Sequence, residues 1–170
     1  MRKNNPEQSE CPVNKDLPCL NKKKTGGLIV LMSPCGFFLN YKEIISSESC
    51  TLVASIIQET VEETDNEFKY IVYDNACKLN AHVKKHPEKY PKILNAKYLI
   101  DRFHIRNHKN QCFKNYNCDD VEAMKNKNTS ICEKTNFMLN RFRFMTKHMT
   151  LEHYDYFFLN YMDFENKHKN

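Results

Sequence analysis

Tyr70-Ile-Val-Tyr73-Asp74 and Lys97-Tyr-Leu-Ile100-Asp101 are two short apolar runs that each stop at an aspartate. Aspartate is rare within strands and common directly after them. The sequence predicts strands over 68–73 and 97–100, joined by a helix over 75–85 that ends near Pro87. Strands joined in this way run parallel, which leaves both aspartates at one sheet edge, about 5 Å apart as neighbours or about 10 Å with a strand between them. Open α/β sheets hold ligands at that edge, so the stretch predicts an α/β fold with a metal or acid site.

Upstream of this stretch, the sequence predicts a β-hairpin and an amphipathic helix. Apolar runs at 28–32 and 37–39 flank Ser33-Pro-Cys-Gly36, in which proline fixes one dihedral angle and glycine tolerates positive φ. Ser47 or Ser49 is the expected N-cap of the helix. Its apolar positions at helical spacing are Leu52, Val53, Ile56, Ile57 and Val61.

Downstream, we expect a C-terminal part that is mainly helical. Methionine and phenylalanine residues between 131 and 145 form a broad apolar face, which predicts core packing rather than contact with a cofactor. A further helix is expected to begin at Thr146 or Thr150, and 165–170 to form a frayed tail. Residues 1–26 are polar and punctuated by prolines, so we expect an irregular segment there and a single domain over 27–170.

Composition narrows the class of protein. A chain of 170 residues is long enough for one core. Its net charge of +5 favours a polyanionic partner such as DNA, although charge alone leaves that question open. The longest apolar run, 28–32, is too short to span a membrane, and the start of the chain lacks the apolar region of a signal peptide. We therefore expect a nuclear or cytoplasmic protein that is not secreted, with its eight cysteines as thiols or metal ligands.

One candidate metal site lies in the segment 101–112, where His104, His108 and Cys112 are spaced four residues apart. On a single helix such positions share a face, so the three side chains could converge on one zinc ion. The further ligand would be Cys77, Cys118 or Asp101. The alternative is a half-exposed histidine pair beside a small core cysteine. Because the chain has no second paired-cysteine motif, both interpretations stay open.

A second candidate is a set of three carboxylates: Asp74, Asp101 and Glu133. Such a set can hold two magnesium ions, which activate a water or a 3′-hydroxyl and stabilise the leaving oxygen of a phosphodiester. The alternative for Asp74 is to cap the helix that follows it. Spacing alone does not separate these roles.

Three strings follow one another in a characteristic order: Tyr73-Asp74-Asn75-Ala76-Cys77-Lys-Leu-Asn-Ala-His82, Asp101-Arg-Phe-His104 with His108 and Cys112, and Asn128-Thr-Ser-Ile-Cys-Glu133-Lys-Thr-Asn136. Together they resemble the transposase domain of the Kyakuja-Dileera-Zisupton (KDZ) family. Cys11-Pro-Val-Asn-Lys-Asp16-Leu-Pro and Gly26-Gly-Leu-Ile-Val also look like that family. The resemblance runs from about Cys11 to Asn166.

The resemblance implies a ribonuclease H-like (integrase) fold with a mixed sheet. It also implies a DDE triad of acids that cuts and joins DNA with two Mg²⁺ or Mn²⁺ ions. By this resemblance, Asp74 is the second catalytic acid, at the end of a strand, and Glu133 is the third, on a later helix. Asp101 and His104 match a signature, Cys or Asp followed three residues later by His, found after the second acid in related transposases.

The family's first acid lies on a first strand that would precede the hairpin. In this chain, residues 1–26 precede the hairpin. Their only aspartate, Asp16, stands next to Leu17-Pro18 in a loop-like context. We therefore expect a mixed sheet that lacks its first strand, and a domain that is truncated and inactive alone.

Two functional hypotheses result. The first is a transposase-derived domain related to DDE DNA cutting and strand transfer. Its expected partner is DNA, and this function is compatible with a homo-oligomer. The alternative is a non-enzymatic DNA- or protein-binding module stabilised by Zn²⁺ on His104, His108, Cys112 and Cys77.

Overall fold

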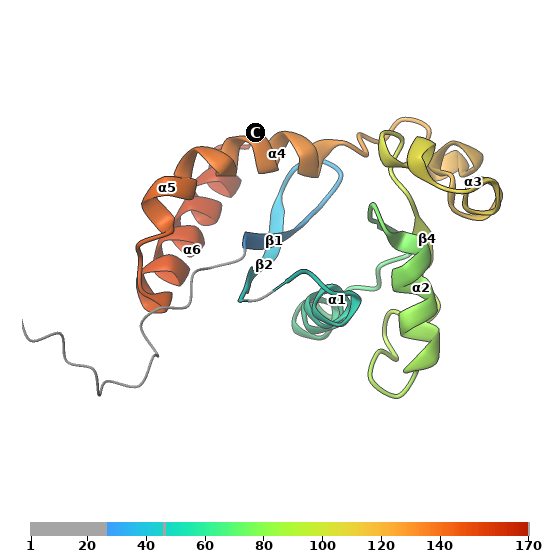
Figure 1. Cartoon of the computed structure of the whole chain (residues 1–170), viewed down its shortest axis with the longest axis horizontal. Helices are drawn as coiled ribbons and strands as arrows, with labels where there is room; N and C mark the ends of the chain where they lie inside the picture. The colour runs from blue at the N-terminus through green and yellow to red at the C-terminus, as the bar shows by residue number, and fades with distance from the viewer. Residues whose placement is uncertain (1–26, 46, 170) are drawn as a thin grey trace, which may run out of the picture.

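The computed structural model describes residues 27–45 and 47–169 (Figure 1). The N-terminal half contains β1 (Gly27–Met32), β2 (Phe38–Ile44), α1 (Cys50–Thr64), β3 (Tyr70–Val72), α2 (Ala76–Lys85) and β4 (Lys97–Leu99). The C-terminal half contains α3 (Asn110–Tyr116), α4 (Ile131–Leu139), α5 (Arg143–Thr146) and α6 (Leu151–Lys167). Short 3₁₀ turns connect them: η2 (His104–Asn107), η3 (Cys118–Asp120), η4 (Glu122–Met124) and η5 (Asn140–Phe142). The irregular segment expected over 1–26 lies outside the described residues.

The predicted hairpin is present and longer than expected. β1 and β2 pair antiparallel from Gly27–Ile44 to Met32–Phe38, with an irregularity after Leu31. The turn closes through a 2.9 Å bond from the Gly36 N–H to the Ser33 carbonyl. Gly36 has a φ of 90°, a conformation that favours glycine at this position.

The amphipathic helix is confirmed as α1. The Ser49 side chain caps it by accepting a hydrogen bond from the Leu52 N–H at 3.2 Å. Of the apolar positions that the sequence singles out, four are buried: Val53, Ile56, Ile57 and Val61. The helix ends at Asp65, which takes the left-handed conformation of a C-cap.

The strand, helix and strand of 70–101 are also confirmed. β3 and β4 pair in parallel, with Ile71 opposite Tyr98, and α2 connects them. Asp74 and Asp101 therefore leave neighbouring strands at the same edge, as predicted. β3 covers only Tyr70–Val72 of the expected 68–73. β4 is one residue shorter than expected, because Ile100 forms an isolated bridge to Asn117 instead of continuing the ladder.

The four strands make two separate two-stranded sheets, which corrects the prediction of one mixed sheet. Among the described residues, β1 pairs only with β2, and β3 only with β4. The physical reason is that no described strand lies between β1 and β3 to bond both. Two-stranded sheets are marginal by themselves, so each depends on the helices packed against it. The coarser α/β class holds.

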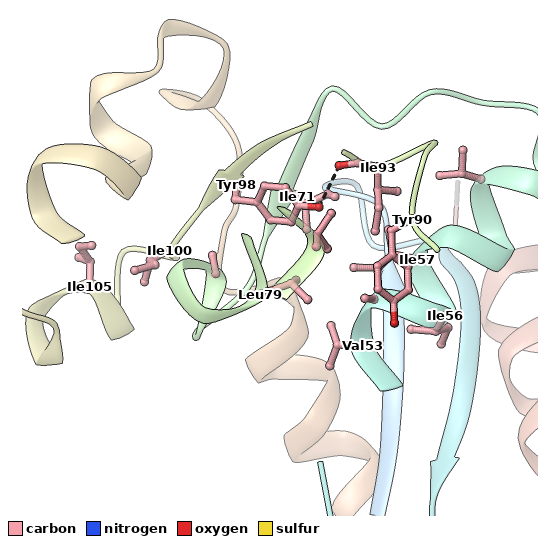
Figure 2. Close-up of a cluster of buried hydrophobic side chains, with 14 residues drawn as sticks. Val53, Ile56, Ile57, Ile71, Leu79, Tyr90, Ile93, Tyr98, Ile100 and Ile105 are labelled. Atoms are coloured by element: carbon pink, nitrogen blue, oxygen red, sulfur yellow. Dashed lines mark hydrogen bonds between the residues drawn. The ribbon is translucent and has the colours of Figure 1, made fainter. Parts of the chain in front are cut away.

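Most of the core lies between α1, α2 and the β3–β4 pair (Figure 2). Its members without solvent contact include Leu79, Val83, Ile93 and Ile100. The Tyr98 hydroxyl donates 2.9 Å to the Ile93 carbonyl, drawn as a dashed line in Figure 2. Burial raises the pKa of Tyr98 to about 12, because the phenolate would lose its hydration.

A second core cluster joins the hairpin to the C-terminal helices; its buried members are Phe38, Leu139, Tyr154, Phe158 and Met162. β1 contributes to both clusters. Ile29 and Leu31 pack against the first cluster, while Leu28, Val30 and Met32 pack against the second. Successive side chains of a strand point to opposite faces, which explains why this strand is apolar at every position.

Two predictions for the C-terminal part are wrong. The apolar face of 131–145 is only partly core, because Phe137 and Phe144 are 71% and 80% exposed; α4 and α5 bury only the side that carries Leu139 and Thr146. The expected frayed tail is helical to Lys167. It is fixed there because the Asn166 side chain accepts from the Phe38 N–H and donates to the Phe38 carbonyl, both at 2.8 Å.

Candidate functional site

A cleft of about 620 Å³ separates the hairpin from the β3–β4 pair. Its walls are the unbroken runs 28–34, along β1, and 67–74, along β3. The remaining wall comes from α1, the loop before α4 and the start of α4. Asp74, Asp101, His104 and Glu133 all line this cleft. The structure thus brings the predicted carboxylates and the histidine of the signature to one cavity.

Asp74 does not cap the helix that follows it. The N-cap position of α2 is Asn75, whose side chain makes no capping hydrogen bond. The Asp74 Oδ1 atom instead accepts from the neighbouring Asn75 N–H at 2.6 Å. Asp74 is half-buried and lines the cleft. This geometry does not support the alternative role of Asp74 as a helix cap.

Asp101 and His104 form one hydrogen-bonded unit. Asp101 is only 6% exposed. Its Oδ1 accepts from the Phe103 and His104 N–H groups at 2.9 and 3.1 Å, which begins the η2 turn. Its Oδ2 lies 2.7 Å from Nδ1 of His104. That contact keeps a proton on Nδ1 and leaves Nε2 directed at the cleft.

Glu133 reaches this unit from α4. It stands in the first turn of α4, its side chain is 52% exposed, and its Oε1 lies 3.7 Å from Nε2 of His104. His104 thus lies between two carboxylates. Within 27–45 and 47–169, Asp74 and Glu133 belong to no group of three or more ligand side chains whose donor atoms all lie within 4.8 Å of one another.

Such a group exists elsewhere, at Cys77, His108 and Cys112. All three are half-buried, and one donor atom from each lies within 4.8 Å of the other two. Cys77 Sγ is 3.8 Å from Nδ1 of His108. Desolvation raises the pKa of Cys112, and a hydrogen bond with Cys77 raises it further. Two sulfurs and an imidazole are ligands that Zn²⁺ prefers, so this cluster could hold a metal such as zinc.

His104 is not part of this cluster, which corrects one of the expected zinc ligands. The sequence spacing assumed one continuous helix, whereas His104 begins η2, His108 follows it in extended conformation, and Cys112 belongs to α3. The break turns His104 toward Asp101 and His108 toward Cys77. Cys118 is also excluded, because its buried Sγ donates to the Ile100 carbonyl at 3.1 Å.

Arg102 is a residue that the sequence analysis missed. Its Nε donates 2.6 Å to Oδ1 of Asp119, and its two Nη atoms donate 2.8 and 2.7 Å to the carbonyls of Lys127 and Met124. The guanidinium thus fixes the loop that leads into α4 and to Glu133. No local signal marks it, because its partners lie 17 to 25 residues away.

The run from α4 to Thr150 is strongly basic. Its cations are Lys134, Arg141, Arg143 and Lys147, all exposed, whereas Glu133 is its only acid. The Arg141 guanidinium lies 5.9 Å from the ring centre of Phe137. Exposed cations in one segment make it a candidate contact for a polyanion.

No described helix is long and apolar enough to cross a membrane. The model of one protein family, described as Kyakuja-Dileera-Zisupton transposase, matches residues 20–166. Neither the curated proteins nor the solved structures contain a significant match.

Proposed function

Because the chain belongs to the Kyakuja-Dileera-Zisupton transposase family, we propose that it is a transposase-derived domain that binds DNA in the nucleus and holds a divalent cation at Asp74 and Glu133. The observation that carries the proposal is the shared cleft, in which these two acids lie with Asp101 and His104. The match extends over 20–166 and so includes all four residues.

The residues at the cleft suit such an ion. Carboxylate oxygens are the donors that Mg²⁺ and Mn²⁺ prefer, and Asp74 and Glu133 supply them from a strand end and a helix start. When bound, the ion would activate a hydroxyl group and stabilise the leaving oxygen of a phosphodiester. Asp101 orients His104, and the Nε2 of His104 holds Glu133 on the cleft side by an ion pair when the imidazole is protonated.

The basic surface on α4 and α5 is the proposed DNA contact. Its cations are exposed, and Glu133 is the only acid within the segment 131–150 itself. Contacts of Lys and Arg with phosphates release counterions, so binding should weaken steeply with salt. We propose that this domain by itself does not perform strand transfer, because only two of the three acids implied by the family resemblance are assigned to the described residues.

Binding of a labelled 30-base-pair duplex, measured by fluorescence anisotropy at several salt concentrations, tests the DNA contact. The variant Lys134→Ala/Arg143→Ala/Lys147→Ala should reduce the slope of log affinity against log salt by about 2 to 3. The control Lys84→Ala/Lys85→Ala/Lys89→Ala removes the same charge from exposed positions on and after α2 and should leave the slope nearly unchanged. Equal effects of the two variants would contradict the proposed surface.

Mn²⁺ binding, measured by electron paramagnetic resonance, tests the acids. Asp74→Asn and Glu133→Gln should each weaken Mn²⁺ binding at least tenfold, since each removes a charged oxygen ligand. Glu152→Gln, an exposed acid on α6, is the matched control and should bind Mn²⁺ like the unchanged protein. Unchanged affinity in both site variants would refute the metal site.

A second candidate function is favoured by the cluster of Cys77, His108 and Cys112. In this alternative, the cluster holds a zinc ion that stabilises a non-enzymatic DNA- or protein-binding module. Purified protein should then contain about one zinc per chain by elemental analysis, and Cys112→Ala should lose it. Cys118→Ala, which changes a buried cysteine outside the cluster, should keep the zinc. Metal-free protein with unchanged thermal stability after chelation would eliminate this candidate.

A further inference from the structure

The helical stretch made of α4, η5 and α5 packs against the rest of the molecule on one side only. The three elements follow one another without a gap from Ile131 to Thr146 and run along the outside of the molecule (Figure 1). The buried side chains of this stretch are Thr135, Leu139 and Thr146. They stand four and seven residues apart, which is the spacing of a single helix face. The opposite face therefore meets solvent.

That opposite face alternates cations with aromatic rings. Lys134, Phe137, Arg141 and Phe144 follow one another at intervals of three or four residues, so they share one face of the stretch. All four side chains are exposed. The Arg141 guanidinium lies 5.9 Å from the ring centre of Phe137, so these two side chains are neighbours. We call these four residues the outer stripe.

The two cations of the outer stripe are not engaged by acids of the same molecule. In the part of the chain that the structure describes, no ion pair includes Lys134 or Arg141. The one acid of the stretch, Glu133, lies with its Oε1 3.7 Å from Nε2 of His104, at the cleft. Both cations of the stripe can therefore contact the anionic groups of a ligand.

The neighbouring helix α6 also exposes aromatic rings, but it surrounds them with acids. Tyr156 and Phe164 of α6 are exposed. The sequence of this helix contains four acids and one lysine. Exposed rings alone do not indicate which partner they bind. The cations of the outer stripe make its rings suited to an anionic partner, whereas the acids of α6 do not.

We propose that the outer stripe binds single-stranded DNA, with unpaired bases stacked on Phe137 and Phe144 and phosphates at Lys134 and Arg141. A DNA strand alternates planar bases with anionic phosphates, as the stripe alternates rings with cations. The two rings are seven residues apart, which is about 10 Å along a helix. Three stacked nucleotides at about 3.4 Å each cover that length. The inference rests on the proposed DNA contact of α4 and α5 and narrows it to a strand with unpaired bases.

The arrangement suits a single strand better than a duplex or a membrane surface. In a duplex the bases are stacked on one another, so their faces are not open to a phenylalanine ring. A helix that lies on a membrane has its apolar side chains on one face and its cations on the other. In the outer stripe the rings and the cations share one face, and the opposite face is occupied by the core.

Fluorescence anisotropy tests the stripe, with a labelled single strand of about 20 nucleotides and a duplex of the same length as probes. Phe137→Ala/Phe144→Ala should weaken binding of the single strand at least tenfold and binding of the duplex less than twofold. The salt dependence should stay the same, because no charge is removed. Phe137→Tyr/Phe144→Tyr keeps both rings and should bind as before. Tyr156→Ala/Phe164→Ala, which removes two exposed rings from α6, is the control and should change neither affinity.

A second measurement reports base stacking directly. The chain contains no tryptophan, so Phe144→Trp introduces a single fluorophore into the stripe. The single strand should quench its emission, whereas a strand of equal length and charge without bases should not. Because this variant keeps an aromatic ring at the site, the measurement decides the question even if the alanine variant does not fold.

Three results would overturn the inference: unchanged affinity of Phe137→Ala/Phe144→Ala for the single strand, equal quenching by the strand without bases, and tighter binding to phosphatidylserine vesicles than to the single strand. The variant Lys134→Ala/Arg143→Ala/Lys147→Ala separates this inference from the proposed function. If it lowers the salt slope while the ring variant has no effect, only the single-strand inference fails. If it leaves the slope unchanged, the proposed DNA contact itself fails.

Discussion

The Nδ1 atom of His104 lies 2.7 Å from Oδ2 of Asp101, whose other oxygen accepts two backbone N–H groups. One buried carboxylate therefore holds the η2 turn and the orientation of the imidazole at the same time. Histidines that bind metals or substrates commonly use one ring nitrogen in this way, which fixes the tautomer of the other. The relationship makes Asp101 a positioning residue for His104.

Asp101→Asn should lower the free energy of unfolding by about 1–3 kcal/mol, because an amide nitrogen replaces one buried acceptor. The change should also disorder the His104 side chain, visible as a shift of its ring resonances in an NMR spectrum. Asp163→Asn is the control, since Asp163 makes only an exposed i,i+4 ion pair with Lys167; its effect should stay below about 0.5 kcal/mol. Similar losses in both variants would contradict the role of Asp101.

Leu79→Ala should cost about 2–5 kcal/mol of unfolding free energy, because the Leu79 side chain has no solvent exposure and lies in the main core cluster. Leu159→Ala makes the same change on α6, where the side chain is 60% exposed, and should cost less than about 1 kcal/mol. Urea unfolding followed by circular dichroism measures both. A small effect at Leu79 would mean that the main core is not packed as described.

Tyr98 should make the protein less stable at alkaline pH. Its pKa is raised to about 12 in the folded state, against about 10 in an unfolded chain. Below pH 10 the phenol is protonated in both states, so its full contribution is present. Between pH 10 and 12 only the unfolded state ionises, and about 2–3 kcal/mol is lost.

Tyr98→Phe is the test of this pH dependence. At pH 8 it should be less stable than the unchanged protein, since the bond to the Ile93 carbonyl is lost. The difference should shrink as the pH rises from 10 toward 12. Urea unfolding at a series of pH values measures this, and a difference that stays constant over the series would exclude the predicted shift.

Arg102→Lys should loosen the loop that leads into α4. Lysine keeps the charge but cannot donate to Asp119, Lys127 and Met124 together. We expect a loss of about 1–3 kcal/mol and faster amide exchange in 119–127. Arg106→Lys, at an exposed position of η2, is the control and should change neither. Unchanged exchange in Arg102→Lys would show that the guanidinium does not hold this loop.

Local signals in the sequence predicted the local structure well. Four features follow from patterns within short stretches of sequence: the hairpin turn, the Ser49 cap, α1 and the parallel pair of β3 and β4. The site depends more on contacts between distant segments. Spacing predicted that His104, His108 and Cys112 share a helix face, whereas the break at His108 directs His104 and His108 to different partners.

The features that the sequence did not predict depend on contacts between segments that are far apart in the chain. The exposure of Phe137 and Phe144 depends on how much of α4 and α5 the hairpin covers, which their own periodicity does not encode. The hydrogen bonds by which Arg102 holds the loop before α4 go to carbonyls more than 20 residues away. The gap between the two sheets likewise depends on the absence of a described strand between β1 and β3, not on any property of the strands themselves.

The double-faced strand β1 also sets an order of events during protein synthesis. Ile29 and Leu31 find their partners in segments that end near Ile105, but Leu28, Val30 and Met32 need Tyr154, Phe158 and Met162. As the chain leaves the ribosome from its N-terminus, one face of the hairpin must wait for Leu139 and then for α6 to emerge. During that interval an apolar surface is available to chaperones or to a neighbouring nascent chain. Final closure of α6 over the hairpin joins residues far apart in sequence, which is slow, so it should be the last step of folding.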